Sequence, residues 1–385
     1  MIAAGLMSGT SLDGIDAVCV EIEPDGDAYR IRTLDFKTVP WEPALRARLF
    51  DALPPNRGTI AELARLNVDA GRALGLAARD VATTHRLDYV ASHGQTMVHD
   101  GDAGVTLQIG DPFAIREAVL ATVCYDFRSA DCAAGGHGAP LVPYFDALVL
   151  RDRSEDRVAV NVGGIANVTL LPKGIASDAG VVAFDTGPGN MLLDAFVAAR
   201  TGGAQCMDED GRLAASGTPD AALLRRMMGD GYFARPAPKS TGRERFGTAF
   251  LDAHREALER LGSPDGAATL LEVTVESIAS AIEASGFRKA RILVSGGGAR
   301  NPRLMDRLAA RLPQARVETT EAMGVPVEAK EAIAFALLGY ETLRGRAANV
   351  PAATGARAPV VLGAIAPYYL SALLERMERE CRASS

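Results

Sequence analysis

The chain has 385 residues, enough for two to three domains of ordinary size. Hydrophobic residues make up 48% and charged residues 23%, a composition typical of globular proteins that argues against disorder. The formal net charge of -7 leaves no broad basic surface, so nucleic acid or an anionic membrane is not expected as the main partner. The 5 cysteines form no disulfide framework and have no metal-site spacing, which favours a reducing cytoplasm. We expect neither a signal peptide nor a membrane span.

Apolar periodicity in the first part of the chain predicts mostly strands. The predicted strands are Ile2–Met7, Ile15–Ile22, Tyr29–Val39, Tyr89–Ser92, Val105–Ile109 and Thr122–Phe127. The predicted helices are Thr59–Val81 and one that closes at Arg116–Ala121. The small residues and prolines of Ser129–Pro143 indicate a long loop, a crossover between domains.

The remaining sequence alternates strands and helices, which predicts an α/β architecture with mixed sheets. The predicted strands are Val158–Val162, Ala166–Leu171, Val181–Phe184 and Arg291–Ser295. The predicted helices are Asn190–Arg200, Ala221–Met228, Thr248–Leu261, Leu270–Ser285, one from Pro302, Glu331–Thr342 and Pro367–Arg382. A unit of strand, glycine turn and strand occurs at Leu6–Val18 and again at Val160–Thr169, which indicates two similar halves.

The turn Ser8–Gly14 is rich in glycine and hydroxyl residues. Backbone N–H groups without a neighbouring Cβ can point at an anion, and Asp13 could orient a hydrated Mg²⁺. A plain hairpin turn would have the same composition. The turn is not a Walker loop, because no lysine follows the glycines, and Ser8 does not lie in a G-x-S-x-G elbow.

Two further glycine-rich turns follow predicted strands. Asn161–Asn167 is a second candidate phosphate hairpin, with a bulge or tight turn as the alternative. Ser295–Asn301 contains three consecutive glycines, which indicates close approach of another group, such as an adenosine, to the backbone. A flexible turn is the alternative, and the spacing differs from the dinucleotide fingerprint.

Three polar segments carry side chains suited to chemistry. Asp185 ends a predicted strand and could act as a general base, or it could cap the following helix. His93 lies in a polar loop and could be an acid–base group, although a structural or substrate-contacting role is favoured. The basic segment Lys239–Glu244 could bind an anion or could be a solvated loop.

Nine motifs in one order resemble the anhydro-N-acetylmuramic acid kinase family. They are GLMSGTSLDGID, SHGQT, LQIGDP, FRSADCAAGGHGAPLVP, NVGGIANVT, FDTGPGNMLLDA, PKSTGRE, SGGGARNPRL and EAIAFALLG. The resemblance extends over Gly5–Gly339. This family belongs to the superfamily of sugar kinases, acetate kinase, actin and the heat-shock chaperone ATPases.

The resemblance implies an α/β fold of two duplicated actin-like ATPase domains of the ribonuclease H type, with the active site in a cleft between them. We expect residues 1–130 with a C-terminal helix at about 366–385 as one domain and residues 131–365 as the other. The implied enzyme uses ATP and water to cleave 1,6-anhydro-N-acetylmuramic acid and to phosphorylate O6, giving N-acetylmuramic acid 6-phosphate and ADP. The resemblance also implies Mg²⁺ carried by ATP, a homodimer, a cytoplasmic location and a role in peptidoglycan recycling.

The family motifs assign roles to individual residues. Asp185 is the implied base that activates water. The implied nucleotide and phosphate ligands are Gly9, Thr10, Ser11, Leu12, Asp13, Gly14, Ile15, Asp16, Asn161, Gly163, Gly164, Gly187, Gly296, Gly297, Gly298 and Asn301. The implied sugar-side residues are His93, Gln95, Thr96, Arg128 and Glu331, with Glu328 as a rival to Glu331. His137 and Gly247 depart from the family pattern, which affects detail at the sugar side only.

Two other functions compete with this one. A kinase of the same fold could act on another anhydrosugar, such as levoglucosan, and a cation placed for the lactyl carboxylate of muramic acid would distinguish the two. An ATPase switch of the chaperone type would need a client-binding domain, which Val350–Ser385 is too short to supply.

Overall fold

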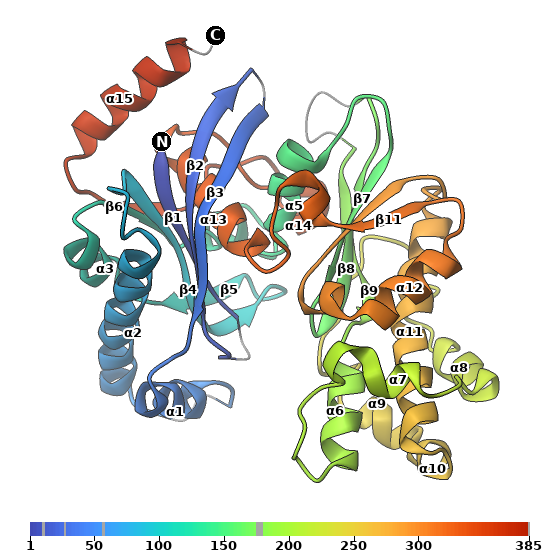
Figure 1. Ribbon diagram of the computed structural model, residues 1–385. Coiled ribbons are helices and arrows are strands. Elements are labelled where there is room, and N and C mark those ends of the chain that lie inside the picture. The colour runs from blue at the N-terminus through green and yellow to red at the C-terminus, as the bar shows by residue number, and fades with distance from the viewer. Residues whose placement is uncertain (10–11, 27, 56–57, 175–179, 384–385) are drawn as a thin grey trace. The chain divides into compact units, whose positions relative to one another are not determined.

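The computed structural model describes residues 1–9, 12–26, 28–55, 58–174 and 180–383 (Figure 1). Contacts divide the chain into two units. Unit 1 consists of Met1–Val149 together with the chain from Ala329 onward, and unit 2 is Leu150–Glu328. Among the described residues, no helix combines the length and the apolar character needed to cross a membrane.

Unit 1 is built on a mixed sheet whose strands run in the order β12-β6-β4-β1-β2-β3, with β5 paired to β4. The bounds are β1 Ile2–Ser8, β2 Ile15–Asp25, β3 Ala28–Val39, β4 Tyr89–Asp100, β5 Val105–Ile109, β6 Thr122–Tyr125 and β12 Ala364–Ala366. Strands β1, β2 and β3 form an antiparallel meander, whereas β4 is parallel to β1 and β6 is parallel to β4.

Both faces of the unit 1 sheet are covered by helices. Successive side chains of β1 point to opposite faces, so β1 contributes to the packing on both. Ala4 and Leu6 join a core with the buried face of α2. On the other face, a Cβ at Gly5 would lie only 1.9 Å from the Ala332 carbonyl oxygen of α13. This glycine therefore lets helix and strand backbones pack in direct contact.

The helices of unit 1 all come after β3 in the chain. They are α1 Pro43–Ala52, α2 Ile60–Val81, α3 Pro112–Val119, α4 Ser129–Ala133, α5 Val142–Phe145, α13 Lys330–Leu343, α14 Pro351–Thr354 and α15 Leu370–Ala383. A π-helical turn, Asp146–Leu150, crosses the boundary between the units. Helix α1 was not predicted, although Glu42 caps it by accepting hydrogen bonds from the Ala44 and Leu45 N–H groups.

Unit 2 repeats the topology of unit 1. Its sheet runs β11-β10-β7-β8-β9, with β7, β8 and β9 antiparallel, β10 parallel to β7 and β11 parallel to β10. The bounds are β7 Arg157–Val162, β8 Ile165–Leu171, β9 Val182–Pro188, β10 Arg291–Ser295 and β11 Arg316–Thr319. The order β9-β8-β7-β10-β11 matches β3-β2-β1-β4-β6 strand by strand, so the expected duplication is confirmed.

The helices of unit 2 follow the strands and enclose a separate core with them. They are α6 Met191–Arg200, α7 Arg212–Ala215, α8 Ala221–Met228, α9 Thr248–Ala253, α10 Arg255–Arg260, α11 Ser263–Ala284 and α12 Pro302–Arg311. Single 3₁₀ turns occupy Glu209–Gly211, Gly297–Arg300 and Thr320–Met323. The helix predicted over Thr248–Leu261 is two helices that break at His254.

Two segments contain more regular structure than predicted. The segment Ser129–Pro143 begins with α4 and ends in α5. The segment Asp185–Gly189 continues strand β9 to Pro188, because its backbone pairs with β8 as far as Ile165.

The units also differ from the expected domain boundaries. Residues 131–149 and 329–365 belong to unit 1, whereas the sequence placed them in the second domain. The reason is packing: α13 covers β1 and β4, and β12 pairs with β6.

Candidate functional site

The first glycine turn joins β1 to β2 and is held at its base by Ser8. The buried Ser8 hydroxyl lies 3.0 Å from the Gly14 carbonyl oxygen and 2.8 Å from Gln95 Oε1, two acceptors that share its single proton, and it accepts from Trp41 Nε1 at 3.2 Å. Leu12 is fully buried with φ 55°. The contacts of Ser8 tie the end of β1 to Gly14, which precedes β2, and to Gln95 of β4.

Most of the residues expected in this turn are described. Gly9, Leu12, Asp13, Gly14, Ile15 and Asp16 surround it, and Asp13 is exposed. Thr10 and Ser11 lie outside the described residues, and their expected contacts with phosphate stay predictions. The Asp16 carboxylate accepts from Thr38 Oγ1 of β3 at 2.6 Å.

The polar residues of β4 meet Arg128, which follows β6. Arg128 Nε donates to His93 Nε2 at 3.0 Å, and Arg128 Nη1 donates to the Gly138 carbonyl at 2.7 Å. Since His93 Nε2 accepts, the ring proton lies on Nδ1, which donates to the Gly94 carbonyl at 2.9 Å. Burial, together with the Arg128 charge, lowers the pKa of His93 well below its usual value. His93 is therefore neutral, and this geometry supports a structural or binding role over proton transfer.

Arg128 presents a cation with donors to spare. Burial lowers its pKa to about 10, so it stays charged at neutral pH. Two of its five N–H bonds are used by His93 and Gly138, and among the described residues no carboxylate lies within ion-pair distance of it. A partly buried guanidinium without a carboxylate partner is suited to binding an anion.

Gln95 and Thr96 occupy supporting positions on β4. Gln95 is fully buried and uses its amide on Ser8 and on the Thr96 carbonyl. The Thr96 hydroxyl accepts from Gln108 Nε2 of β5 at 3.2 Å. Both residues lie next to His93 in sequence, and their expected contacts with a sugar stay predictions.

Glu331 and its rival Glu328 lie in different units. Glu331 begins α13, and burial raises the pKa of its carboxyl, while Lys330 and Arg128 oppose the rise. Lys330 itself is buried and pairs with Asp146 at 2.7 Å. Glu328 belongs to unit 2 and pairs with Arg300. Glu331 therefore shares the electrostatic environment of Arg128.

In unit 2 the second glycine turn, between β7 and β8, packs against two other glycine segments. The N–H of Gly189 donates to the Gly164 carbonyl, and the N–H of Asn190 donates to the Gly163 carbonyl, both at 2.8 Å. A Cβ at Gly189 would lie 2.2 Å from the Gly163 oxygen. The turn after β7 and the loop before α6 therefore form one backbone cluster.

The three consecutive glycines after β10 complete this cluster. A Cβ at Gly296, which has φ 79°, would lie 2.6 Å from Asn161 Oδ1, and one at Gly298 would lie 2.4 Å from Val162 Cγ1. For these two positions the group that approaches the backbone is the neighbouring turn of the same unit. At Gly297 a Cβ would meet nothing closer than Asn190 Nδ2 at 3.8 Å, so the fold itself does not require a glycine here.

Two expected nucleotide ligands have local structural tasks as well. The Asn301 side chain caps α12 by accepting from the Leu304 N–H at 3.1 Å. Gly187 has φ 154°, and a Cβ there would lie 2.7 Å from Phe233 Cε1. Whether either residue contacts a nucleotide stays a prediction.

Asp185 lies in β9 opposite Asn167 of β8 and is held from three sides. Its carboxylate accepts from the Thr241 N–H at 2.9 Å, its own N–H donates to the Lys239 carbonyl at 3.0 Å, and its carbonyl accepts from Tyr232 at 2.8 Å. Burial raises the pKa of its carboxyl to about 6, although the Thr241 hydrogen bond opposes the rise. An acid with this pKa is ionised at neutral pH and is more basic than an ordinary carboxylate, as a general base requires.

Sequence reasoning missed how the segment around Lys239 serves Asp185. Lys239 Nζ donates to the Tyr232 and Phe233 carbonyls, both at 3.2 Å, and lies 4.7 Å from the centre of the Tyr232 ring. The segment is thus neither an open anion site nor a solvated loop at this lysine. Its backbone holds the strand that carries Asp185. Tyr232 gave no signal of its own, since only the tertiary structure brings it to β9.

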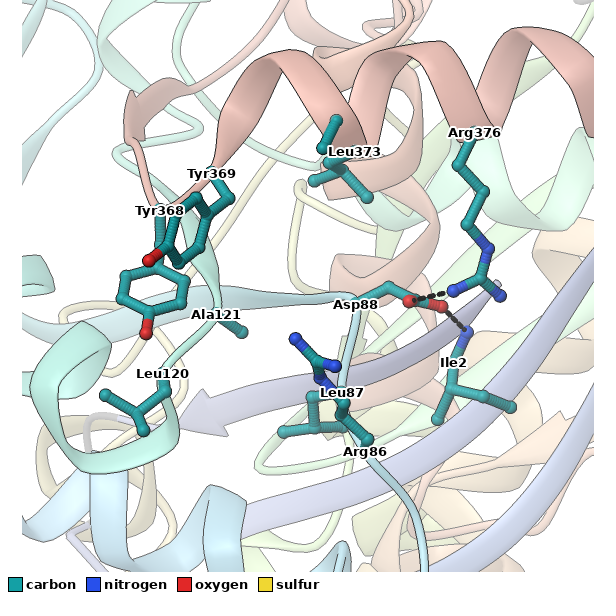
Figure 2. A pocket seen from close by; sticks show the side chains of 11 residues that line it. Ile2, Arg86, Leu87, Asp88, Leu120, Ala121, Tyr368, Tyr369, Leu373 and Arg376 are labelled. Atoms are coloured by element: carbon teal, nitrogen blue, oxygen red, sulfur yellow. Dashed lines mark hydrogen bonds and ion pairs between the residues drawn. The ribbon is translucent and has the colours of Figure 1, made fainter.

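A separate pocket of about 260 Å³ lies at the opposite end of the unit 1 sheet (Figure 2). Asp88 connects its walls: it accepts from the Ile2 N–H at 2.8 Å and pairs with Arg376 of α15 at 2.5 Å. Tyr368 and Tyr369 line the other side (Figure 2). Ile2 and Asp88 lie at the starts of β1 and β4, whereas the candidate residues lie toward the ends of these strands. The contacts of Asp88 therefore fasten α15 to the sheet, away from the candidate site.

Among the described residues, no group of three or more His, Cys, Asp or Glu side chains is arranged to hold a metal ion.

Two solved structures align with most of this chain at low sequence identity. One is an activator of 2-hydroxyisocaproyl-CoA dehydratase from Clostridium difficile with bound ADPNP, at TM-score 0.44 and 12% identity, covering 89% of this chain and 95% of that one. Another is a ROK family glucokinase from Streptomyces griseus in complex with glucose and AMPPNP, at TM-score 0.39 and 11% identity, covering 88% and 99%.

Sequence relatives are much more similar. A relative from Xanthomonas axonopodis pv. citri is 45% identical over 92% of this chain and 95% of its own length, and one from Streptomyces coelicolor is 44% identical over 92% and 90%. Both are named anhydro-N-acetylmuramic acid kinase. The model of the family described by the same name matches residues 1–368. The chain therefore belongs to the anhydro-N-acetylmuramic acid kinase family.

Proposed function

We propose that this protein is a phosphotransferase that uses ATP and water to convert 1,6-anhydro-N-acetylmuramic acid into N-acetylmuramic acid 6-phosphate and ADP, in peptidoglycan recycling. Family membership supports the reaction class. The observation that carries the mechanism is Asp185, a buried acid with a pKa of about 6 that is held by Thr241.

The bridging oxygen O6 of the substrate is an ether and has no proton to lose, so ring cleavage must accompany phosphorylation. Asp185 takes a proton from water while the water oxygen forms a bond to C1. The C1–O6 bond breaks toward O6, O6 forms a bond to the γ-phosphorus, and the bond from that phosphorus to the bridging oxygen of ADP breaks. Asp185 later releases its proton to solvent. The protein contributes positioning and a base of matched pKa.

Arg128 supports muramic acid over other anhydrosugars as the substrate. Its guanidinium is charged and partly buried, and it is oriented by His93 and Gly138. The lactyl carboxylate is the anionic group that distinguishes muramic acid from levoglucosan, and an oriented guanidinium matches it. Glu331 shares this environment and is assigned to the sugar ring.

The glycine cluster of unit 2 and the turn after β1 are assigned to ATP. The turns at Gly163–Gly164 and at Gly9–Asp16 supply backbone N–H groups for phosphates, and Gly297, where the fold itself does not require a glycine, is assigned to the nucleoside. Mg²⁺ would be held mainly by the phosphates, with Asp13 as an exposed acid near its waters. When bound, it would neutralise charge that develops on the phosphates.

The proposal includes a cellular setting and an assembly. Its need for ATP places the enzyme in the cytoplasm. The proposed assembly is a homodimer, which light scattering on the purified protein tests directly: a mass of one chain, 40.4 kDa, would contradict it.

The deciding experiment measures sugar-dependent ADP release in ¹⁸O-labelled water, with prompt mass analysis of the products. We expect turnover of 1,6-anhydro-N-acetylmuramic acid, much weaker turnover of levoglucosan, and the heavy isotope at C1 of the sugar phosphate. Label in inorganic phosphate without sugar phosphate would indicate an ATPase and would contradict the proposal. Equal turnover of levoglucosan would contradict the role of Arg128.

A further inference from the structure

We propose that Asp131 is a positioning residue for Arg128: through the Gly138 peptide it orients the guanidinium that receives the substrate carboxylate. The inference rests on the function proposed above and adds a residue that lies outside the substrate contacts. Asp131 lies in α4, three residues after Arg128, and is fully buried.

The Asp131 carboxylate holds two segments together. Its Oδ2 accepts from the Gly138 N–H at 2.8 Å. Its Oδ1 accepts from Asn349 Nδ2 and from the Thr354 hydroxyl, each at 2.7 Å. Both donors are themselves buried; Asn349 precedes α14 and Thr354 is its last residue. Every polar neighbour in this network donates, so the network requires an acceptor with two oxygens.

The bond to Gly138 links this network to the candidate site. Gly138 uses its N–H on Asp131 and its carbonyl on Arg128 Nη1, at 2.7 Å. Two hydrogen bonds orient the Arg128 guanidinium, one to the Gly138 carbonyl and one to His93. Asp131 therefore positions the acceptor of the first of them. The loop also has no space to adjust, because a Cβ at Gly136 would lie 2.2 Å from Asp131 Oδ2.

Asparagine at this position cannot replace the carboxylate. One of its two polar atoms is an NH₂ group, which would face either the Gly138 N–H or the Asn349 and Thr354 donors. Either orientation sets donor against donor and costs at least one buried hydrogen bond. We expect residue 138 to shift and the Arg128 guanidinium to lose its defined orientation.

The test compares two substrates that differ at the carboxylate. Asp131→Asn is assayed with 1,6-anhydro-N-acetylmuramic acid and with 1,6-anhydro-N-acetylglucosamine, which lacks the lactyl group and is followed as a substrate or as a competitive inhibitor. We expect KM for the muramic compound to rise about tenfold with kcat nearly unchanged. The constant for the glucosamine compound should change less than about twofold. Asp126→Asn is the matched control: Asp126 precedes the same helix, and among the described residues its side chain forms hydrogen bonds with Ser129 alone, so the substitution should change neither constant.

Two further variants make every result informative. Thr354→Val removes a single donor from the network and should give a smaller but equally selective rise in KM, which covers the case in which Asp131→Asn does not fold. Arg128→Gln tests the underlying assignment: without a selective loss in this variant, the proposed role of Arg128 is wrong. A selective loss in Arg128→Gln, combined with equal losses for both sugars in Asp131→Asn and Thr354→Val, would show that Asp131 only stabilises the fold and would overturn the inference.

Discussion

Replacing Asp185 by asparagine should abolish turnover without disturbing the fold. The asparagine oxygen can still accept from the Thr241 N–H, and the two backbone contacts of residue 185, with Lys239 and Tyr232, are unaffected. What disappears is the second carboxylate oxygen as a proton acceptor. A positioned general base contributes about 10²–10⁴-fold to rate, or about 3–5 kcal/mol of barrier, and kcat should fall by that factor.

The pKa gives the sign of the accompanying stability change. Burial raises the pKa of Asp185 from 3.8 to about 6, so the folded state binds its proton more tightly than the unfolded state. Ionised Asp185 therefore destabilises the fold above pH 6, by at most about 3 kcal/mol, and partial exposure reduces that figure. Removing the charge should leave the melting temperature equal or higher, so unfolding cannot explain a loss of activity.

Single-turnover kinetics with 1,6-anhydro-N-acetylmuramic acid, together with calorimetric titration of ATP, test both parts. The wild-type rate should fall below about pH 6 with a slope of one as Asp185 becomes protonated. The affinity of the variant for ATP should stay within about twofold, since the glycine turns of unit 2 are intact. A variant that keeps more than about a tenth of the wild-type rate would remove Asp185 from the role of base.

Three other substitutions or measurements test the structure elsewhere. Asp194→Asn is a matched control, because burial also raises the pKa of Asp194 to about 6. This variant should keep kcat and should have a higher melting temperature than the wild type at pH 7.5, and the difference should vanish near pH 4. A loss of kcat as large as that of Asp185→Asn would contradict this expectation. Gly5→Ala places a methyl group 1.9 Å from the Ala332 oxygen and should lower the free energy of unfolding by about 3 kcal/mol or more in urea titrations, whereas wild-type stability would contradict the packing of α13 on β1. His93 should stay neutral at pH 6 in ¹⁵N spectra of its ring, because burial holds its pKa well below 6.5; a protonated ring would contradict the tautomer assigned from its contact with Arg128.

Local sequence patterns predicted much of the fold. Strands such as Ile15–Asp25 and helices such as Ile60–Val81 follow from apolar periodicity and a capping residue, here Thr59, because these signals lie within the element itself. The repeated unit of strand, glycine turn and strand predicted the duplication, which the matching strand orders confirm. The acid of the FDTGPGN motif was identified by its neighbours in sequence alone.

Contacts between distant segments decided the rest. No local signal assigns residues 329–365 to unit 1, because α13 belongs there only through its contact with β1. The close approach expected at Gly296 is real, but its partner is Asn161 of the same unit, and no local signal distinguishes a protein neighbour from a ligand. Likewise the pKa of Asp185 depends on its burial, which raises the pKa, and on a hydrogen bond from the Thr241 N–H, more than 50 residues away in sequence, which lowers it. Residue types and spacing thus determined which chemistry is available, whereas desolvation and hydrogen-bond partners, which exist only in the folded chain, decided the charge and orientation of each group.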